Sequence, residues 1–198
     1  MKTAAAIILL LALVGMYPRH KKKENHPPGM PPAAVYDITT PSPDIVQRIV
    51  RHAKAIRPRS GQSDEELTRI AENIVKYSTA YGIEPELGAA LIARESGYNP
   101  RATSPSGACG LGQMMPGTAA KMGATDCHDI EQGVRGSMAY MRSLMDTWSG
   151  RDMQVDCALA SYLTGPRNVK CDSSLWQSGN CSRYLKGIYE YRNAIKSY

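Results

Sequence analysis

The chain has 198 residues, of which 42% are hydrophobic and 21% are charged, and this composition is that of one globular domain with appended segments. The net charge of +6 divides unevenly, because residues 1–59 hold ten Lys and Arg against three Asp and Glu, whereas residues 60–198 hold fourteen against fifteen. A near-neutral domain with a basic arm argues against a dedicated nucleic-acid-binding fold, so we expect no nucleic-acid partner. The charge of the arm favours binding to anionic lipid or to an anionic wall polymer. The alternative is a solvated run of charges that binds nothing.

The chain begins with an apolar segment. Residues 3–17 are uncharged and mainly apolar, which fits the core of a signal peptide and is short for a membrane-spanning helix of about 20 residues. No small-x-small cleavage site closes this run, and the basic cluster 19–23 follows at once. We therefore assign residues 1–17 to a membrane segment or a signal peptide, and the uncleaved membrane segment is slightly favoured.

A linker is predicted over residues 18–60. Seven prolines lie between positions 18 and 43, without helical or strand periodicity over most of that length, which indicates an extended tether. A short basic amphipathic helix is expected over residues 44–57, either as padding for the domain, which is favoured, or on a membrane surface. The folded domain is expected over residues 61–198.

Helical patterns fill the remainder of the chain. Ser63 and Glu66 form a capping box that opens a helix ending at Gly82, and Asp129 with Gln132 forms a similar pair. Further helices are predicted over residues 85–96, 118–122, 130–148, 152–162 and 180–198. The last of them turns Tyr184, Ile188, Tyr191, Ile195 and Tyr198 inward. Because no alternating strand pattern and no internal repeat is present, the sequence predicts an all-α domain.

One acid stands out within these helices. At 100° per residue, Leu87, Leu91, Ile92 and Glu95 fall within one arc of about 140°, whereas Ala89, Ala93 and Ser96 lie opposite. A carboxylate in the middle of an apolar face is costly unless it has partners, and its pKa tends to rise. A general acid that works near neutral pH needs such a pKa. A side chain that snorkels to solvent would explain Glu95 equally well if the helix stood alone.

An ordered motif begins at Glu95 and favours a general acid over a side chain that reaches solvent. Its residues are Glu95-Ser96, Tyr98-Asn99-Pro100, Ala102, Ser104, Gly107-Ala108, Gly110-Leu111-Gly112-Gln113, Pro116 and Thr118-Ala119. This segment resembles the lytic transglycosylases of the goose-lysozyme type, which carry the soluble lytic transglycosylase domain. The resemblance implies a lysozyme-like helical fold for the all-α domain and peptidoglycan glycan strands as the substrate.

The resemblance also implies a mechanism with a single acid. In that family one Glu protonates the glycosidic oxygen between N-acetylmuramic acid and N-acetylglucosamine, the muramyl N-acetyl group assists, and the Glu then takes the proton of the sugar's 6-hydroxyl. A 1,6-anhydromuramyl end forms and no water is consumed. Glu95 is the catalytic residue that the resemblance implies, and the substrate-binding residues that it implies are Ser96, Gly112, Gln113, Met114, Tyr162 and Thr164.

A third family motif is matched only in part. Residues 158–166 read ALASYLTGP, where the family usually reads A-x-A-x-Y-N-A-G. Tyr162 and Gly165 match, and the match implies that Tyr162 approaches the catalytic Glu. The family's Asn and Ala are Leu163 and Thr164 here, so a contact of the missing amide is not expected.

Other functions stay open from the sequence. A hydrolytic muramidase of the same fold would need a second acid in the cleft, such as Asp126, Asp129 or Asp152. A non-catalytic wall-binding or structural component of a virion or secretion machine would keep the fold without the chemistry, and a peptide-cleaving relative is a third alternative. A cysteine protease is disfavoured because Cys127 and His128 are adjacent in sequence.

No cofactor and no metal are expected, since His20, His26 and His52 lie in the arm and no phosphate-binding glycine loop is present. The apolar segment, the tether and the wall-cutting domain suit a location in the cell envelope, facing the periplasm, anchored or exported. The partners would then be the membrane and a secretion, conjugation or division system. A phage virion is the alternative location.

The five cysteines all lie in the domain. In an oxidising compartment they allow two disulfides and one free thiol. Cys171–Cys181, which closes a short loop, is the first choice, and Cys109–Cys127 would brace the motif against the next helix. Cys157 is then the buried free thiol. The alternative is that all five are reduced.

Overall fold

The computed structural model describes residues 42–57 and 61–198, and this part of the chain is helical. The elements are α1 (Pro43–Ile56), α2 (Asp64–Ala80), α3 (Pro85–Ser96), α4 (Pro116–Lys121), α5 (Ile130–Thr147), α6 (Gln154–Thr164), η1 (Pro166–Asn168), η2 (Ser173–Trp176) and α7 (Gly179–Ser197). Extended pairing in the described residues is limited to isolated bridges around Cys109. The predicted all-α domain is therefore confirmed.

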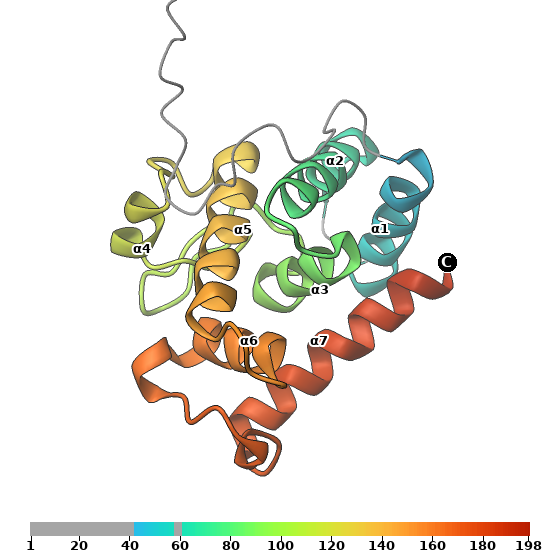
Figure 1. The fold of residues 1–198 in the computed structure, drawn as a ribbon. Coiled ribbons are helices and arrows are strands. Elements are labelled where there is room, and N and C mark those ends of the chain that lie inside the picture. Colours follow the sequence, from blue (N-terminus) through green and yellow to red (C-terminus); the bar gives the residue numbers. More distant parts are fainter. Residues whose placement is uncertain (1–41, 58–60) are drawn as a thin grey trace, which may run out of the picture.

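Helix α3 lies at the centre of the fold (Figure 1), where it packs most extensively against α7 and also contacts α1 and α2. Pro85 stands at its first turn, where a missing N–H costs no hydrogen bond. Because α3 packs against neighbours on more than one side, Ala89, Ala93 and Ser96, which we placed opposite the apolar face, are buried as well. The C-terminal end of α3 carries Glu95.

Helix α1 differs from the prediction, which placed it in the linker. Val46, Ile49 and Ala53 are buried in the same core as α2 and α3, and His52 is buried with them. The apolar face of α1 therefore packs against the rest of the domain, which is the alternative that the sequence favoured, and the folded unit includes residues 43–56. The apolar segment 1–17 and most of the linker lie outside the described residues.

The helix starts follow the predicted caps. The Ser63 hydroxyl accepts from the Glu66 backbone N–H at 3.1 Å, and the Asp129 carboxylate accepts from the Gln132 N–H at 2.8 Å. In α7 the prediction for Tyr198 is wrong, because this residue follows the helix end and is 45% exposed. Helix α6 begins at Gln154, two residues after the predicted start.

Two disulfides cross-link the domain. Cys109–Cys127 is present as predicted. The second bridge is Cys157–Cys171, and the predicted Cys171–Cys181 pair is wrong. The chain after α6 turns through η1 and brings the Cα of Cys171 to 5.4 Å from that of Cys157, while Cys181 is buried as a free thiol in the first turn of α7.

Across residues 42–57 and 61–198, every helix is too short or too polar to cross a bilayer.

Candidate active site

Glu95 sits at the point where α3 ends and the motif loop (residues 97–115) begins. Gly97 closes the helix with φ +59°, a left-handed conformation that favours glycine. A Cβ there would also lie 2.5 Å from the Arg57 side chain. One carboxyl oxygen of Glu95 accepts a hydrogen bond from the hydroxyl of Tyr184, which comes from α7. The acid is thus held between two helices that are far apart in sequence.

The pKa of Glu95 is raised to about 7, and burial is the cause. The hydrogen bond from Tyr184 and the positive charge of Arg94 act in the opposite direction and limit this rise in the pKa. Near neutral pH the carboxyl group is therefore protonated in part of the molecules and ionised in the rest. A group in that condition is able both to give and to take a proton.

Two tyrosines flank this acid. The Tyr162 hydroxyl of α6 donates to the Gly112 carbonyl at 2.8 Å. Burial raises the pKa of Tyr162 and of Tyr184, and the nearby charge of Glu95 raises both further. Both phenols therefore stay protonated and act as hydrogen-bond donors. The approach of Tyr162 to Glu95 that the resemblance implies stays a prediction, because the Tyr162 hydroxyl donates to the Gly112 carbonyl and the Glu95 carboxyl group accepts from Tyr184.

The motif loop is held close to α5 at Gly112. A Cβ at this position would lie 1.8 Å from Ser137 Oγ and 2.8 Å from the Tyr162 hydroxyl, so only glycine fits. Gln113 adopts φ +47°, and its amide nitrogen donates to the Ala102 carbonyl at 3.1 Å and the Gly110 carbonyl at 3.0 Å. The amide nitrogen of Gln113 thus braces the loop from within.

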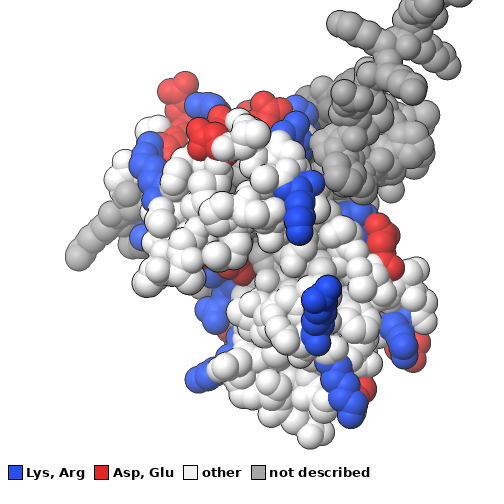
Figure 2. Space-filling model, turned by 90° about the vertical axis from the view of Figure 1, so that its left-hand side faces the viewer, with Lys and Arg blue, Asp and Glu red and all other residues white. Residues whose placement is uncertain are grey.

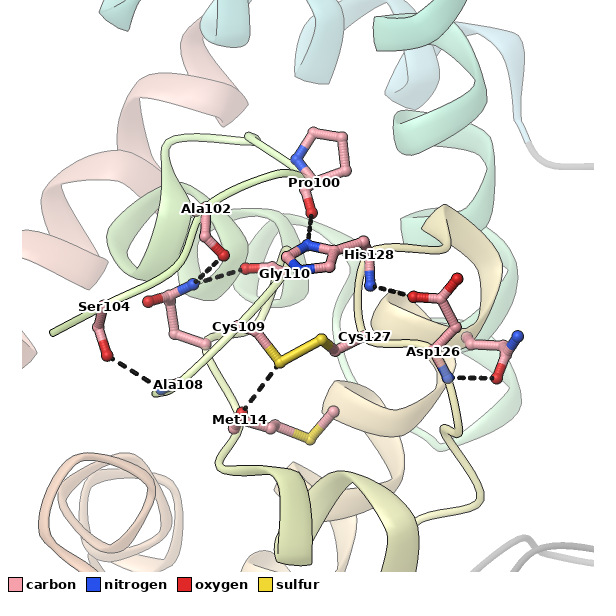
Figure 3. Close-up of a disulfide and its surroundings, with 12 residues drawn as sticks. Pro100, Ala102, Ser104, Ala108, Cys109, Gly110, Met114, Asp126, Cys127 and His128 are labelled. Atoms are coloured by element: carbon pink, nitrogen blue, oxygen red, sulfur yellow. Dashed lines mark hydrogen bonds between the residues drawn. A yellow bond between two sulfur atoms is a disulfide. The ribbon is translucent and has the colours of Figure 1, made fainter. Parts of the chain in front are cut away.

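The Cys109–Cys127 disulfide ties the same loop to the segment before α5 (Figure 3). A Cβ at Gly110 would lie only 1.7 Å from the Cys127 carbonyl oxygen, which shows how tightly the two segments pack. His128 Nδ1 lies 2.9 Å from the Pro100 carbonyl oxygen and adds a second link between them (Figure 3). The motif loop is therefore tied to the segment before α5 by a disulfide and by a side-chain contact to its backbone.

The remaining predicted site residues lie in varied surroundings. Ser96 is buried, and its hydroxyl donates to the Ile92 carbonyl at 3.2 Å. The Met114 side chain is buried in a small cluster with Ala119 and Ala124. Thr164 is exposed at the end of α6 and donates to the Ala160 carbonyl at 3.0 Å.

Sequence reasoning missed the two residues that act directly on the acid. Tyr184 was placed on the inward stripe of the last helix, but periodicity does not tell which side chain of another helix it meets. Arg94 precedes the acid and was not considered, although adjacency to Glu95 was a signal. Its guanidinium lies 5.7 Å from the centre of the Tyr184 ring.

A groove of about 480 Å³ opens beside Tyr184. It is lined by Arg94, Leu163, Thr164, Asn180, Arg183 and Tyr184. Thr164 and Leu163, where the sequence departs from the family motif, thus lie on one groove with the tyrosine that holds the acid. On the face that carries α4 and the motif loop, Asp and Glu are interspersed with Lys and Arg along the upper edge (Figure 2), and the middle is mostly uncharged.

Over the residues that the structure describes, His, Cys, Asp and Glu form no group of three or more that could hold a metal ion.

The family described as the transglycosylase SLT domain matches residues 72–180. A transglycosylase of Enterobacteria phage PRD1 is 38% identical over 94 residues, which are 48% of this chain and 34% of that protein. The membrane-bound lytic murein transglycosylase F of Pectobacterium atrosepticum is 38% identical over 105 residues, 52% of this chain and 21% of that protein. The match thus covers about a third or less of either relative.

Among solved structures, the lytic transglycosylase Slt of Pseudomonas aeruginosa aligns with 80% of this chain and 36% of its own, at 18% identity and a TM-score of 0.45.

Proposed function

Because the chain belongs to the transglycosylase SLT domain family, we propose that it is a lytic transglycosylase. It cleaves the β-1,4 bond between N-acetylmuramic acid and N-acetylglucosamine in peptidoglycan, leaves a 1,6-anhydromuramyl end, and so opens the cell wall locally. The observation that carries this proposal is Glu95, a partly buried acid at the end of α3 whose pKa is raised to about 7.

One carboxyl group is sufficient for this reaction. The protonated Glu95 gives its proton to the glycosidic oxygen as the bond to the anomeric carbon breaks, and the muramyl N-acetyl oxygen attacks that carbon. The ionised Glu95 then removes the proton of the muramyl 6-hydroxyl, whose oxygen displaces the N-acetyl oxygen. The proton count closes, since Glu95 ends as it began. Tyr184 keeps the carboxyl group oriented during both transfers.

The other site residues enter the proposal as supports and substrate contacts. Tyr162 and Gly112 together form one wall, because the hydroxyl of the first donates to the carbonyl of the second. Gln113 and Met114 shape the motif loop, and Ser96 holds the end of α3. Thr164 contacts the sugar from the groove, on which it is exposed.

The hydrolytic alternative is less favoured. It needs a second carboxylate near the scissile bond, about 5–10 Å from the first. Among the described residues, the charged group that shifts the pKa of Glu95 is Arg94, and no Asp or Glu does so. Asp129 caps α5, and the Asp126 carboxylate accepts the His128 backbone N–H. A non-catalytic module would not need an acid with a pKa near 7.

The test is Glu95→Gln against intact peptidoglycan, with Glu72→Gln as the matched control, because Glu72 is an exposed acid on α2. We expect Glu95→Gln to lose at least a thousandfold in cleavage rate and the control to keep wild-type activity. Mass spectrometry of the products distinguishes anhydro ends from reducing ends by one water. Full activity in Glu95→Gln, or reducing ends alone, would refute the proposal.

We further propose a setting in the bacterial envelope or in a phage particle. The apolar run 3–17 and the basic cluster after it support attachment to a membrane, and secretion, conjugation or virion assembly systems are candidate partners. The intact mass of the protein purified from its natural source tests this point. A mature N-terminus beyond residue 17 would rule out the uncleaved anchor.

A further inference from the structure

The groove beside Tyr184 carries positive charge on its lining, and the acid that acts on this charge is the adjacent Glu95, which interacts with Arg94. Two of its lining residues, Arg94 and Arg183, are arginines, and none is an Asp or Glu. Ion pairs elsewhere in the described residues engage Arg48, Arg101, Arg142 and Arg192, but neither groove arginine takes part in one. The first turn of α7, which forms one side of the groove, also holds no acid.

Both guanidinium groups are held in place by neighbours that leave their charge intact. Arg183 donates through Nε to the Gly179 carbonyl and through Nη2 to Asn180 Oδ1, each at 2.8 Å. These bonds use two of the five N–H donors of a guanidinium, and the others remain for a ligand. Arg94 stacks over the Tyr184 ring, and Gly187 presents no side chain against it. The two cations are thus positioned before any ligand arrives.

The chemistry of such a groove selects a carboxylate. A guanidinium presents a planar fork of donors that matches a carboxylate in two parallel hydrogen bonds. In a glycan strand of peptidoglycan the hydroxyl and N-acetyl groups are neutral. The acidic groups are the carboxylates of the stem peptide, or the lactyl carboxylate of a muramic acid from which the peptide has been removed.

We propose that this groove is an anionic subsite, in which Arg94 and Arg183 bind a carboxylate attached to the muramic acid next to the cleaved bond. The inference rests on the proposed function, because it places the muramic acid beside Glu95. Its consequence is a preference for carboxylate-bearing strands over neutral ones. The preference falls with rising salt, since the groove is open to solvent.

The experiment compares two matched pairs of soluble glycan strands. One pair keeps the stem peptides and the other has lost them to an amidase, and in each pair one member has its carboxylates converted to methylamides. We expect the wild-type protein to cleave the carboxylate member of one pair about tenfold faster in kcat/KM, from charge-assisted hydrogen bonds. The pair that shows the effect identifies the source: the stem peptide or the lactyl group.

The variants assign the preference to the groove. Within a pair, the ratio of kcat/KM for the carboxylate member to kcat/KM for the methylamide member should fall to about two or less in Arg183→Gln. The control is Arg151→Gln, which replaces an exposed arginine before α6 and should keep the wild-type ratio. Thermal unfolding checks that both variants fold. Ratios near one in the wild type, or an unchanged ratio in Arg183→Gln, would overturn the subsite.

A binding measurement separates this inference from the proposed function. Calorimetry of the same strands on the Glu95→Gln protein requires no turnover. A preference for carboxylate-bearing strands there, abolished when Arg183→Gln is added, supports the subsite even if the wild type fails to form anhydro ends. Equal binding of both members of each pair counts against the subsite, even if the wild type cleaves as proposed.

Discussion

Glu95→Gln makes a prediction about stability that is independent of any assay for cleavage. Burial raises the pKa of Glu95 from 4.5 to about 7. The protonated acid therefore suits the folded state, and the stability that it contributes is fully present below about pH 4.5 and is lost as the pH rises through about 7. At 1.36 kcal/mol per pH unit, the loss amounts to about 3 kcal/mol.

The glutamine side chain carries no charge at any pH, and its carbonyl oxygen still accepts from Tyr184. The variant should therefore become more stable than the wild type as the pH rises, by about 3 kcal/mol between pH 4 and pH 8. For a chain of this length the difference corresponds to roughly 6 to 12 °C in Tm.

The comparison has to be made as a difference, because His52 acts in the opposite sense. Burial lowers the pKa of His52 from 6.5 to about 4. Its contribution to stability is fully present above pH 6.5 and is lost as the pH falls through about 4. In the wild type, the contributions of Glu95 and His52 to stability offset each other over the same range of pH. Glu95→Gln removes the contribution of Glu95, and the contribution of His52 remains.

The assay is urea unfolding at pH 4, 6 and 8 with the disulfides intact, on the wild type, Glu95→Gln and the exposed control Glu72→Gln. The free energy of unfolding of the control should run parallel to that of the wild type. If Glu95→Gln also runs parallel, the acid does not carry the raised pKa, and the reasoning about its role as a proton donor fails with it.

Two further substitutions test the site. Tyr184→Phe removes the hydrogen bond that favours the ionised form of Glu95, so the pKa of Glu95 should rise. The basic limb of the pH profile of kcat/KM should then move up by about one pH unit, and a limb that stays in place or moves down contradicts this. Gly112→Ala forces a Cβ into Ser137 Oγ and should lower the free energy of unfolding by about 2–4 kcal/mol. The control is Gly117→Ala on α4, where a Cβ meets nothing within 4 Å and the change should be less than about 1 kcal/mol. Equal effects of the two substitutions would refute the close packing of the loop.

Local sequence features determined the helices and located the acid. Capping pairs such as Ser63 with Glu66 act within one turn, and Gly97 ends α3 by its own backbone preference, so both can be read without the fold. The ordered motif after Glu95 identified the catalytic candidate and Gly112, because these features are short-range in sequence.

The contacts between distant segments were decided only by the tertiary structure. Tyr184 reaches Glu95 from 89 positions away, Cys157 pairs with Cys171 rather than leaving it to Cys181, and α1 enters the core. Helical periodicity specifies which face of a helix is buried but not the angle and partner with which it packs. The pKa of Glu95 depends on that packing, since burial between α3 and α7 is what raises it.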